Sequence, residues 1–532
     1  MEIRTILHSN GPRKNIYPKR RSAIACDVCR SRKTKCNGDK PQCSFCQTVG
    51  ANCIYRPIQM APSPPHEITL SAVLQRVERL ETDARRPKSY DSRTRRPADL
   101  LHEPEANPFP NKLKKSQLMI RTAGINYDVT DNIVDLETPP SLPTTLLQMP
   151  DSLNSSLLTL FFDRIYIWYP ILDKRTFAED FLAANKQGLT NSSSSCLILL
   201  VSAIGALVYN VQNGIDDEAL EYAGLAFQML HLIMMDNTLI AIQCLILYGV
   251  YYLLLIKPVQ AYEYITCASF KIQNLMKRNH NVNGFKAELT RRVYYAIFLL
   301  ERELLVQLDL AESGIGLLQD LVPLPSGTLE LDNNESESVP FFLAEIALRK
   351  LMDRATLNDL LDTRHEIRFA NLVAAELDFQ LVQWRSNLPL SVAFPDTHLP
   401  EDDLSLYLQV QYYALMTGIY WPGLYQAIVT KDRSTEMMFI CQKCFIAYCS
   451  FMDSIEEFCS RPVSIPLISM SLASVFSFTL GMTAARSEVL VEELVALEGR
   501  FEKAIEVLRR YSDRSATVNQ WTEILASVIR SR

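Results

Sequence analysis

Six cysteines between residues 26 and 53 constrain this chain more than any other feature. They form two C-x2-C-x6-C units joined by a six-residue loop, so one short unit occurs twice. A closed structural zinc site needs four ligands, and each unit has only three sulfurs. Two tetrahedral ions therefore share two of the six sulfurs, and the spacing predicts a fused cluster of two structural zinc ions. All six are its predicted ligands: Cys26, Cys29, Cys36, Cys43, Cys46 and Cys53.

Two other uses of these cysteines stay open at this point. An iron–sulfur cluster is one, although the common ferredoxin spacings differ from the spacing here. A disulfide framework is the other, but it would need an oxidising compartment, and the first 25 residues lack the apolar core of a secretory signal. The remaining seven cysteines are scattered. Even the close set Cys441, Cys444 and Cys449 is predicted to be core packing, because no histidine lies near it.

The two cysteine units differ in charge. The residues between Cys29 and Cys36 are strongly basic, whereas those between Cys46 and Cys53 carry no charge. A metal site alone does not need this asymmetry, but docking on a polyanion does, because Lys and Arg neutralise phosphates and read guanine edges in the major groove. The alternative is that the basic run only offsets the negative charge of the cluster. The predicted DNA-binding residues are Arg30, Arg32, Lys33 and Lys35.

The stretch from Ala25 to Arg56 resembles the fungal zinc binuclear-cluster (Zn2Cys6) transcription factors. The resemblance covers the six cysteines, the basic run and Pro41. It implies that Cys26 and Cys43 bridge the two metals and that Lys33 reads bases, with Arg32 as a lesser contributor. It also implies a nuclear, sequence-specific regulator of RNA polymerase II genes that binds double-stranded DNA at CGG-type half-sites and recruits transcription machinery or co-regulators.

Charge is distributed unevenly along the chain. The formal net charge is −6, yet residues 1–60 hold twelve Lys and Arg against three acidic residues. A basic head on an acidic body suits a protein whose head alone meets nucleic acid. We expect residues 1–20 to be a disordered basic arm, suited to nuclear import or to phosphate contact, and residues 21–57 to be the zinc DNA-binding domain.

A linker with a short coiled coil is predicted over residues 58–86. Apolar residues repeat there at spacings of three and four, which is the seam of a coiled-coil dimer. The seam is about two heptads long, so it is marginal alone, and a plain linker helix is the alternative. The predicted dimerisation residues are Leu70, Val73, Val77 and Leu80. Residues 87–150 are expected to be a disordered linker. Residues 125–137 alternate acidic and apolar residues as activation segments do, but the favoured alternative is an ordinary segment that docks on the next domain.

The chain is predicted to become a large all-α domain over residues 151–512, followed by a C-terminal tail over 513–532. Only 17 glycines occur in the chain, and the long apolar runs lack strand alternation. The stretch from Leu157 to Asp173 resembles the opening of the middle homology region of the fungal regulators. The stretches Gln243–Leu255 and Arg291–Pro325 resemble later parts of that region, although its usual Gly-Arg-Pro is missing. The resemblance implies a regulatory domain, and the predicted fold class is mainly α.

Other functions are less well supported by the sequence. The uncharged stretches Thr238–Ile256 and Pro462–Ala485 are long enough to span a bilayer, but their polar residues favour buried core helices, so we expect no membrane partner. No zinc-protease, P-loop or nucleophile-elbow motif occurs, so nothing argues for an enzyme. The main rival is a zinc-dependent protein-interaction scaffold or co-regulator that does not read DNA directly.

Overall fold

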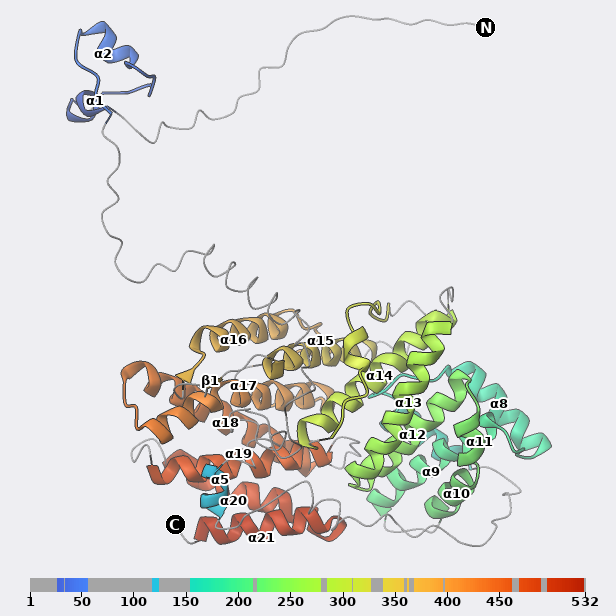
Figure 1. Ribbon diagram of the computed structural model, residues 1–532. Coiled ribbons are helices and arrows are strands. Elements are labelled where there is room, and N and C mark those ends of the chain that lie inside the picture. Colours follow the sequence, from blue (N-terminus) through green and yellow to red (C-terminus); the bar gives the residue numbers. More distant parts are fainter. Residues whose placement is uncertain are drawn as a thin grey trace, which may run out of the picture. The chain divides into compact units, whose positions relative to one another are not determined.

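The computed structural model describes residues 26–32, 34–55, 117–123, 154–213, 218–278, 285–308, 310–326, 338–357, 361–362, 368–395, 398–461, 468–488 and 495–530 (Figure 1). The chain divides into two compact units, Met1–Leu100 and Leu101–Arg532. The basic arm 1–20, the predicted coil with Leu70, Val73, Val77 and Leu80, and the segment 125–137 lie outside the described residues.

In the described part of the first unit, cysteine residues form the buried centre. It contains two short helices, α1 (Asp27–Ser31) and α2 (Ser44–Thr48), each of which begins directly after a cysteine. Cys43 is the N-cap residue of α2, and its sulfur accepts the backbone N–H of Cys46. The most buried residues are Cys26, Cys29, Cys43 and Cys46, at no more than 1% exposed. So short a segment has too little apolar surface for a core, so its stability depends on what the sulfurs bind.

The second unit is almost entirely helical, as the sequence predicts. Its two strands among the described residues, β1 (Leu361–Asp362) and β2 (Arg368–Phe369), form a small antiparallel pair with Leu361 opposite Phe369. The helices are α5 (Gln117–Ala123), α7 (Ser155–Arg164), α8 (Lys174–Gln187), α9 (Ser193–Asn213), α10 (Glu218–Gln228), α11 (Leu230–Met235), α12 (Leu239–Leu254), α13 (Pro258–Arg278), α14 (Phe285–Gln307), η2 (Ile315–Leu318), α15 (Ser338–Leu357), α16 (Asn371–Ser386), α17 (Asp403–Thr430), α18 (Thr435–Ser460), α19 (Ile468–Glu488), α20 (Val495–Arg509), η4 (Ser512–Arg514) and α21 (Ala516–Arg530).

Helix α12 is the centre of the first half of this unit. It packs against α9 and α13, and every residue from Ala241 to Leu254 is buried. A helix that is apolar on all sides is stable only inside a protein, which explains why the uncharged stretch predicted here becomes a core helix. Thr238 caps its start by accepting the Ala241 N–H at 3.3 Å, and α13 begins at Pro258, where a missing backbone N–H costs nothing.

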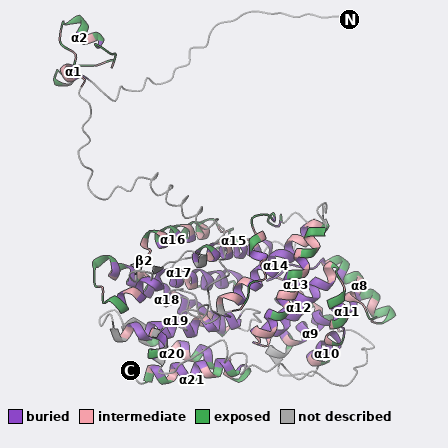
Figure 2. Ribbon diagram, in the orientation of Figure 1, coloured by how far each residue is buried: buried purple, intermediate pink, exposed green. Residues whose placement is uncertain are grey.

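The second half is organised around the α17–α18 hairpin. Figure 2 shows these two helices and α19, largely buried, between α16 on one side and α20 on the other. Trp168, in the segment after α7, packs edge-on against Phe341 of α15 and Tyr407 of α17, with ring centroids 5.2 and 5.0 Å apart. Aromatic pairs in this geometry add to the area they bury. The stretch that resembles the start of the middle homology region therefore joins the two halves of the unit.

The helical unit extends further at both ends than the sequence predicts. Helix α5 lies within the stretch expected to be a disordered linker, yet it packs on α19 and α21, and Met119 is buried. Helix α21 lies within the expected C-terminal tail, yet it buries Val518, Trp521 and Leu525 against α19 and α20. Trp521 stacks on Phe476 at 5.3 Å. Helices α5 and α21 pack against each other and against α19. The apolar residues of each helix are therefore buried by residues from distant parts of the sequence.

One described helix is long and apolar enough to cross a membrane. It spans Ile468–Arg486, and 94% of that window is buried inside the protein. A helix that crosses a bilayer would contact lipid, whereas α19 contacts α17, α18, α20 and α21. Helix α19 thus has the length and apolar composition of a membrane-spanning helix but is a core helix of this unit.

A buried ion triad connects α14 to α15. Arg349 lies between Glu303 and Glu345, and no side chain of the three is more than 7% exposed. Burial raises the pKa of Glu345 to about 7, although Arg349 opposes this effect. Burial likewise raises the pKa of Glu303 above its ordinary value. Taking such charges out of water costs several kcal/mol per ion, so each partner depends on the others.

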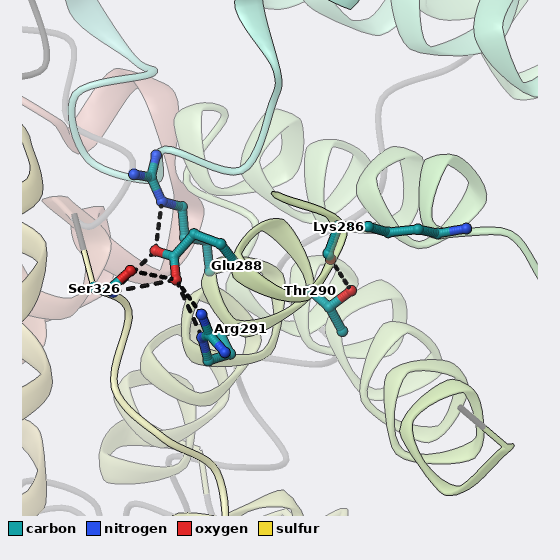
Figure 3. A network of polar contacts seen from close by, with 6 residues as sticks. Lys286, Glu288, Thr290, Arg291 and Ser326 are labelled. Carbon is teal, nitrogen blue, oxygen red and sulfur yellow. Dashed lines mark hydrogen bonds and ion pairs between the residues drawn. The ribbon is translucent and has the colours of Figure 1, made fainter. Parts of the chain in front are cut away.

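The irregular segment 310–326 is tied to the helices by side chains. At its end, the buried carboxylate of Glu288 accepts the Ser326 N–H at 3.0 Å and the Arg291 guanidinium at 2.7 Å (Figure 3). Burial acts to raise the pKa of Glu288, but these donors outweigh it, so the pKa lies below its ordinary value. Gly316 packs so closely on Arg302 that a Cβ there would lie 1.8 Å from the guanidinium. These contacts fix the path of the segment, in which the short 3-10 helix η2 is the regular element.

Candidate metal centre and nucleic-acid interface

Four cysteine sulfurs form a compact group. The Sγ atoms of Cys26, Cys29, Cys43 and Cys46 all lie within 4.8 Å of one another, and all four residues are buried. The Cys26–Cys43, Cys26–Cys46 and Cys29–Cys43 sulfur pairs are 3.7, 3.5 and 3.6 Å apart. A tetrahedral ion with Zn–S bonds of about 2.3 Å sets its sulfurs roughly 3.8 Å apart. The sulfurs therefore fit the edges of zinc tetrahedra.

The six cysteines differ in their contacts. Cys26 and Cys43 lie in the middle, because each has two close sulfur partners within the compact group. The Cys53 sulfur accepts the backbone N–H of Cys43 at 3.3 Å, and the Cys36 sulfur lies 3.6 Å from the Tyr55 hydroxyl. Cys36 and Cys53 are half-buried. The Cys26 and Cys43 sulfurs are thus the most connected of the group.

The cysteine repeat of the sequence is also a repeat of hydrogen bonds, with a period of 17 residues. The Cys29 N–H donates to the Cys26 sulfur, and the Cys46 N–H donates to the Cys43 sulfur, both at 3.5 Å. Backbone N–H groups aimed at sulfur stabilise the thiolate form that metals bind. Three further hydrogen bonds of the first half recur 17 residues later in the second half. Two join a backbone N–H to a carbonyl: Arg32 to Val28 and Val49 to Phe45, and Thr34 to Cys29 and Ala51 to Cys46. The third joins a backbone N–H to a sulfur: Cys26 to Cys36 and Cys43 to Cys53.

Thiol acidity differs between the positions. Burial, together with the neighbouring sulfurs of Cys26 and Cys43, raises the pKa of Cys29 to about 12. Burial also raises the pKa of Cys46. The backbone N–H of Cys46 instead lowers the pKa of Cys43, and that of Cys26 lowers the pKa of Cys36. A metal that binds here displaces the remaining thiol protons, so its affinity depends on pH.

Polar residues of the loop hold the two halves together. The Gln42 side chain donates to the Ala51 carbonyl at 2.8 Å, and the Ser44 N–H donates to the Asn37 side chain at 3.1 Å. Tyr55 lies 3.6 Å from the Cys36 sulfur and donates to the Asp39 carbonyl at 3.0 Å. None of these residues is among the site residues predicted from the sequence. Their place directly around the cysteines is the signal that could have identified them, since metal ligands need oriented neighbours.

The predicted DNA-binding residues fall at the end of α1 and just after it. Arg32 and Lys35 are exposed. Arg30 lies in α1, and its side chain is outside the described part, as is Lys33 altogether. The uncharged half exposes apolar side chains instead, Val49 at 45% and Ile54 at 52%. The two cysteine units thus have the same backbone hydrogen bonds, but one exposes basic side chains and the other exposes apolar side chains.

The cysteine cluster and the helical unit together define a class of protein, a metal-binding head combined with a large all-α domain. The model of the fungal Zn(2)-Cys(6) binuclear cluster domain matches residues 24–62. The model of the fungal specific transcription factor domain matches residues 158–386. The chain therefore belongs to the fungal zinc binuclear-cluster transcription factors, and its cysteine head is a zinc-binding domain.

Similar proteins carry names that agree with this family. The chain is 28% identical over 523 residues to the putative transcription factor ecdB of Aspergillus rugulosus. The aligned region covers 87% of this chain and 88% of ecdB. It is 25% identical over 231 residues to the citrinin biosynthesis transcriptional activator ctnR of Monascus purpureus, covering 39% and 37% of the two chains. It is 42% identical over 69 residues to the regulatory protein CAT8 of Saccharomyces cerevisiae, covering 13% and 5%. No solved structure matches the chain.

Proposed function

We propose that this transcription factor is a nuclear regulator of RNA polymerase II genes. Its zinc cluster docks in the major groove at CGG-type half-sites, and the chain acts as a homodimer that recruits transcription machinery or co-regulators. The observation that carries the proposal is the pair of matched halves, which share one sulfur and backbone frame but carry basic residues on one side only. The proposed domain limits are those expected from the sequence, except that α5 (Gln117–Ala123) and α21 (Ala516–Arg530) belong to the helical regulatory domain.

In the proposed centre each zinc ion has four sulfur ligands. One ion is held by Cys26, Cys29, Cys36 and Cys43, and the other by Cys26, Cys43, Cys46 and Cys53. The 3.7 Å separation of Cys26 and Cys43 supports a shared edge between the two tetrahedra. The zinc supplies folding energy to the head when it is bound. The protein supplies oriented thiolates and a basic outer surface.

The mode of DNA binding can be tested through salt. A protein that neutralises several phosphates loses affinity steeply as salt rises, because it releases counterions from DNA. We expect the full chain to bind a duplex with a CGG triplet, and to lose affinity between 50 and 200 mM salt by at least about tenfold. A scaffold that uses its zinc head only to bind protein would show neither specific binding nor this slope in a gel-shift titration.

Different basic residues are expected to have different tasks on DNA. Lys33→Ala should cost about 1–3 kcal/mol on the preferred site and broaden its sequence preference, because Lys33 is the proposed base reader. Arg30→Ala should weaken all sites about equally and reduce the salt slope by roughly one unit per half-site, because a phosphate contact carries no base information. Selection from a random duplex pool at fixed salt measures both effects.

The exposed loop residue Lys40 provides a matched control, since Lys40→Ala removes one positive charge outside the basic run. It should leave the selected motif unchanged. If Lys33→Ala selects the same motif as sharply as the wild type, Lys33 does not read bases. If Lys33→Ala and Arg30→Ala behave alike, the basic run only neutralises charge.

The proposed coil is tested by Val77→Asp. A charge in the middle of a two-heptad seam should weaken dimers and lower the affinity for paired half-sites at least about tenfold, because a coil this short has little stability to lose. Binding to a single half-site should not change. Gel-shift titrations on duplexes with one and two half-sites make the comparison, and equal affinity of wild type and variant for the paired site would show that residues 58–86 are only a linker.

A further inference from the structure

A cavity lies inside the helical unit, where residues of α14, α15, α17, α18 and α19 meet. Its volume is about 30 Å³, and the residues around it are mostly apolar. Glu303, Arg349, Gln411 and Ser471 are the buried polar residues among them. A water-sized group needs about 10–15 Å³ of such space, so the cavity has room for a ligand of roughly two or three non-hydrogen atoms.

Gly418, near the middle of α17, leaves part of this space open. A Cβ added to this buried residue would meet no heavy atom within 4 Å among the described residues, apart from the backbone of α17 itself. Protein interiors are close-packed, and glycine is less favourable than alanine inside a helix. Packing and helix stability would both favour alanine here, so an occupant of the space accounts for the glycine.

The Ser471 hydroxyl lines the cavity without a partner. Ser471 is 4% exposed, and its Oγ has no hydrogen-bond partner among the described residues. Other serines of α19 bond to their own helix: Ser474 donates to the Met470 carbonyl at 3.3 Å, and Ser477 donates to the Ala473 carbonyl at 2.7 Å. A buried hydroxyl without a partner costs free energy, so Ser471 indicates a polar occupant.

The ion triad beside the cavity lacks one positive charge. Glu303 and Glu345 share Arg349 as their cation. Tyr169 and Tyr407 lie next to these carboxylates and are neutral, because burial raises the pKa of both well above its ordinary value. Glu345 Oε1 has no hydrogen-bond partner in the part of the chain that the structure describes. A buried charge without a partner is costly, so the triad needs a further cation or a proton.

The charges next to the triad do not supply that cation. Arg302 pairs with Asp353 at 3.4 Å and with Glu312 at 3.2 Å, so it is already shared between two carboxylates. Burial raises the pKa of Asp353 to about 6, although Arg302 opposes this effect. The described surroundings of the triad are therefore acidic as well.

An ammonium-type cation meets these requirements. It is compact and carries N–H donors on several sides, so it can donate to the Glu303 carboxylate and the Ser471 hydroxyl together. Ca²⁺ takes about six to eight oxygen ligands and Mg²⁺ retains several waters, and a small, mostly apolar cavity has too few ligands and too little room for either. A proton would neutralise Glu345, but it would leave the space empty and the Ser471 hydroxyl without a partner.

We propose that this cavity binds ammonium or a short primary ammonium ion such as methylammonium. The N–H groups contact Glu303 and Ser471, and a methyl group lies toward Gly418. The bound cation connects α14 to α19, so it stabilises the folded helical unit. The site is independent of the zinc head and of the proposed DNA binding, and it makes the helical unit responsive to small amines.

The test is the melting temperature of the full chain, followed by helical circular dichroism at constant ionic strength. A ligand that binds only the folded state raises this temperature. About 50 mM ammonium or methylammonium chloride should raise it by at least about 2 °C relative to potassium chloride. Tetramethylammonium chloride should act like potassium chloride, because its cation is too large and has no N–H donor.

Two substitutions in the cavity have matched controls outside it. Ser471→Ala should fold normally, since its hydroxyl has no described partner, and should abolish the ammonium response. Ser477→Ala, on the same helix, should keep the response. Gly418→Ala should fill the space, raise the melting temperature without ligand and abolish the response. Gly499→Ala also adds a Cβ with no described atom within 4 Å, but on α20, and should keep the response.

Three results would overturn the proposal. One is a wild type that melts at the same temperature in ammonium and potassium chloride. Another is a response that Ser471→Ala and Gly418→Ala both retain, because ammonium then acts elsewhere on the chain. The third is a stability that falls between about pH 5 and pH 8 and is the same with and without ammonium, because a proton on the triad then supplies the missing charge. The melting curves themselves show that each variant is folded.

Discussion

Cys43→Ser is expected to release both metal ions and to abolish DNA binding by the full chain. Cys43 lies 3.7 Å from the Cys26 sulfur and 3.6 Å from the Cys29 sulfur, and it also accepts the N–H that begins α2. As a proposed bridge it belongs to both tetrahedra, so its loss leaves each ion with three ligands. Because the described part of the head has a core of sulfur alone, loss of metal removes its folding energy.

Zinc per chain, measured by elemental mass spectrometry on purified protein, gives the result directly. The wild type should hold two ions and Cys43→Ser none. Cys444→Ser is the control, because Cys444 is a fully buried core residue of α18 and should not change the metal content. One zinc ion per wild-type chain, or one ion retained by Cys43→Ser, would contradict the fused cluster.

Arg349→Met should destabilise the helical unit by about 3–5 kcal/mol. The substitution leaves Glu303 and Glu345 buried without their common cation. A buried carboxylate without a partner must take up a proton or the structure must open, and both cost free energy. Urea denaturation followed by helical circular dichroism measures the loss.

The same triad provides a control that isolates charge from packing. Arg349→Met combined with Glu303→Gln and Glu345→Gln should recover part of the lost stability, because no unpaired charge then remains. Lys286→Met, a substitution at an exposed lysine at the start of α14, should change stability by less than about 0.5 kcal/mol (Figure 3). If Arg349→Met is as mild as Lys286→Met, the triad does not hold α14 to α15.

The zinc-binding head could be predicted because all of its ligands lie within 28 residues and follow a regular spacing. Metal coordination imposes that spacing locally, so the pattern survives without knowledge of the tertiary structure. The mainly α fold could be predicted for a similar reason, because the periodic apolar runs of α12 and α17 are local. The coil residues remain a prediction, as do the two zinc ions and the base-reading role of Lys33.

The long-range features could not be predicted in this way. Glu303 and Arg349 are far apart in sequence, and nothing local distinguishes them from surface charges. Helix α5 is seven residues long, too short to be stable alone, and forms because α19 and α21 bury it.

The repeated hydrogen bonds of the zinc head have a consequence for how such a protein changes over evolutionary time. The frame uses backbone N–H and C=O groups and cysteine sulfurs, which are the same whatever the neighbouring side chains are. Arg32 and Lys35 are exposed, so their replacement leaves the ligand frame intact. If the basic run contacts DNA as we propose, substitutions in it change DNA recognition while the metal-binding frame is kept. A gene duplicate that keeps its cysteines can then acquire new target sequences within a few substitutions.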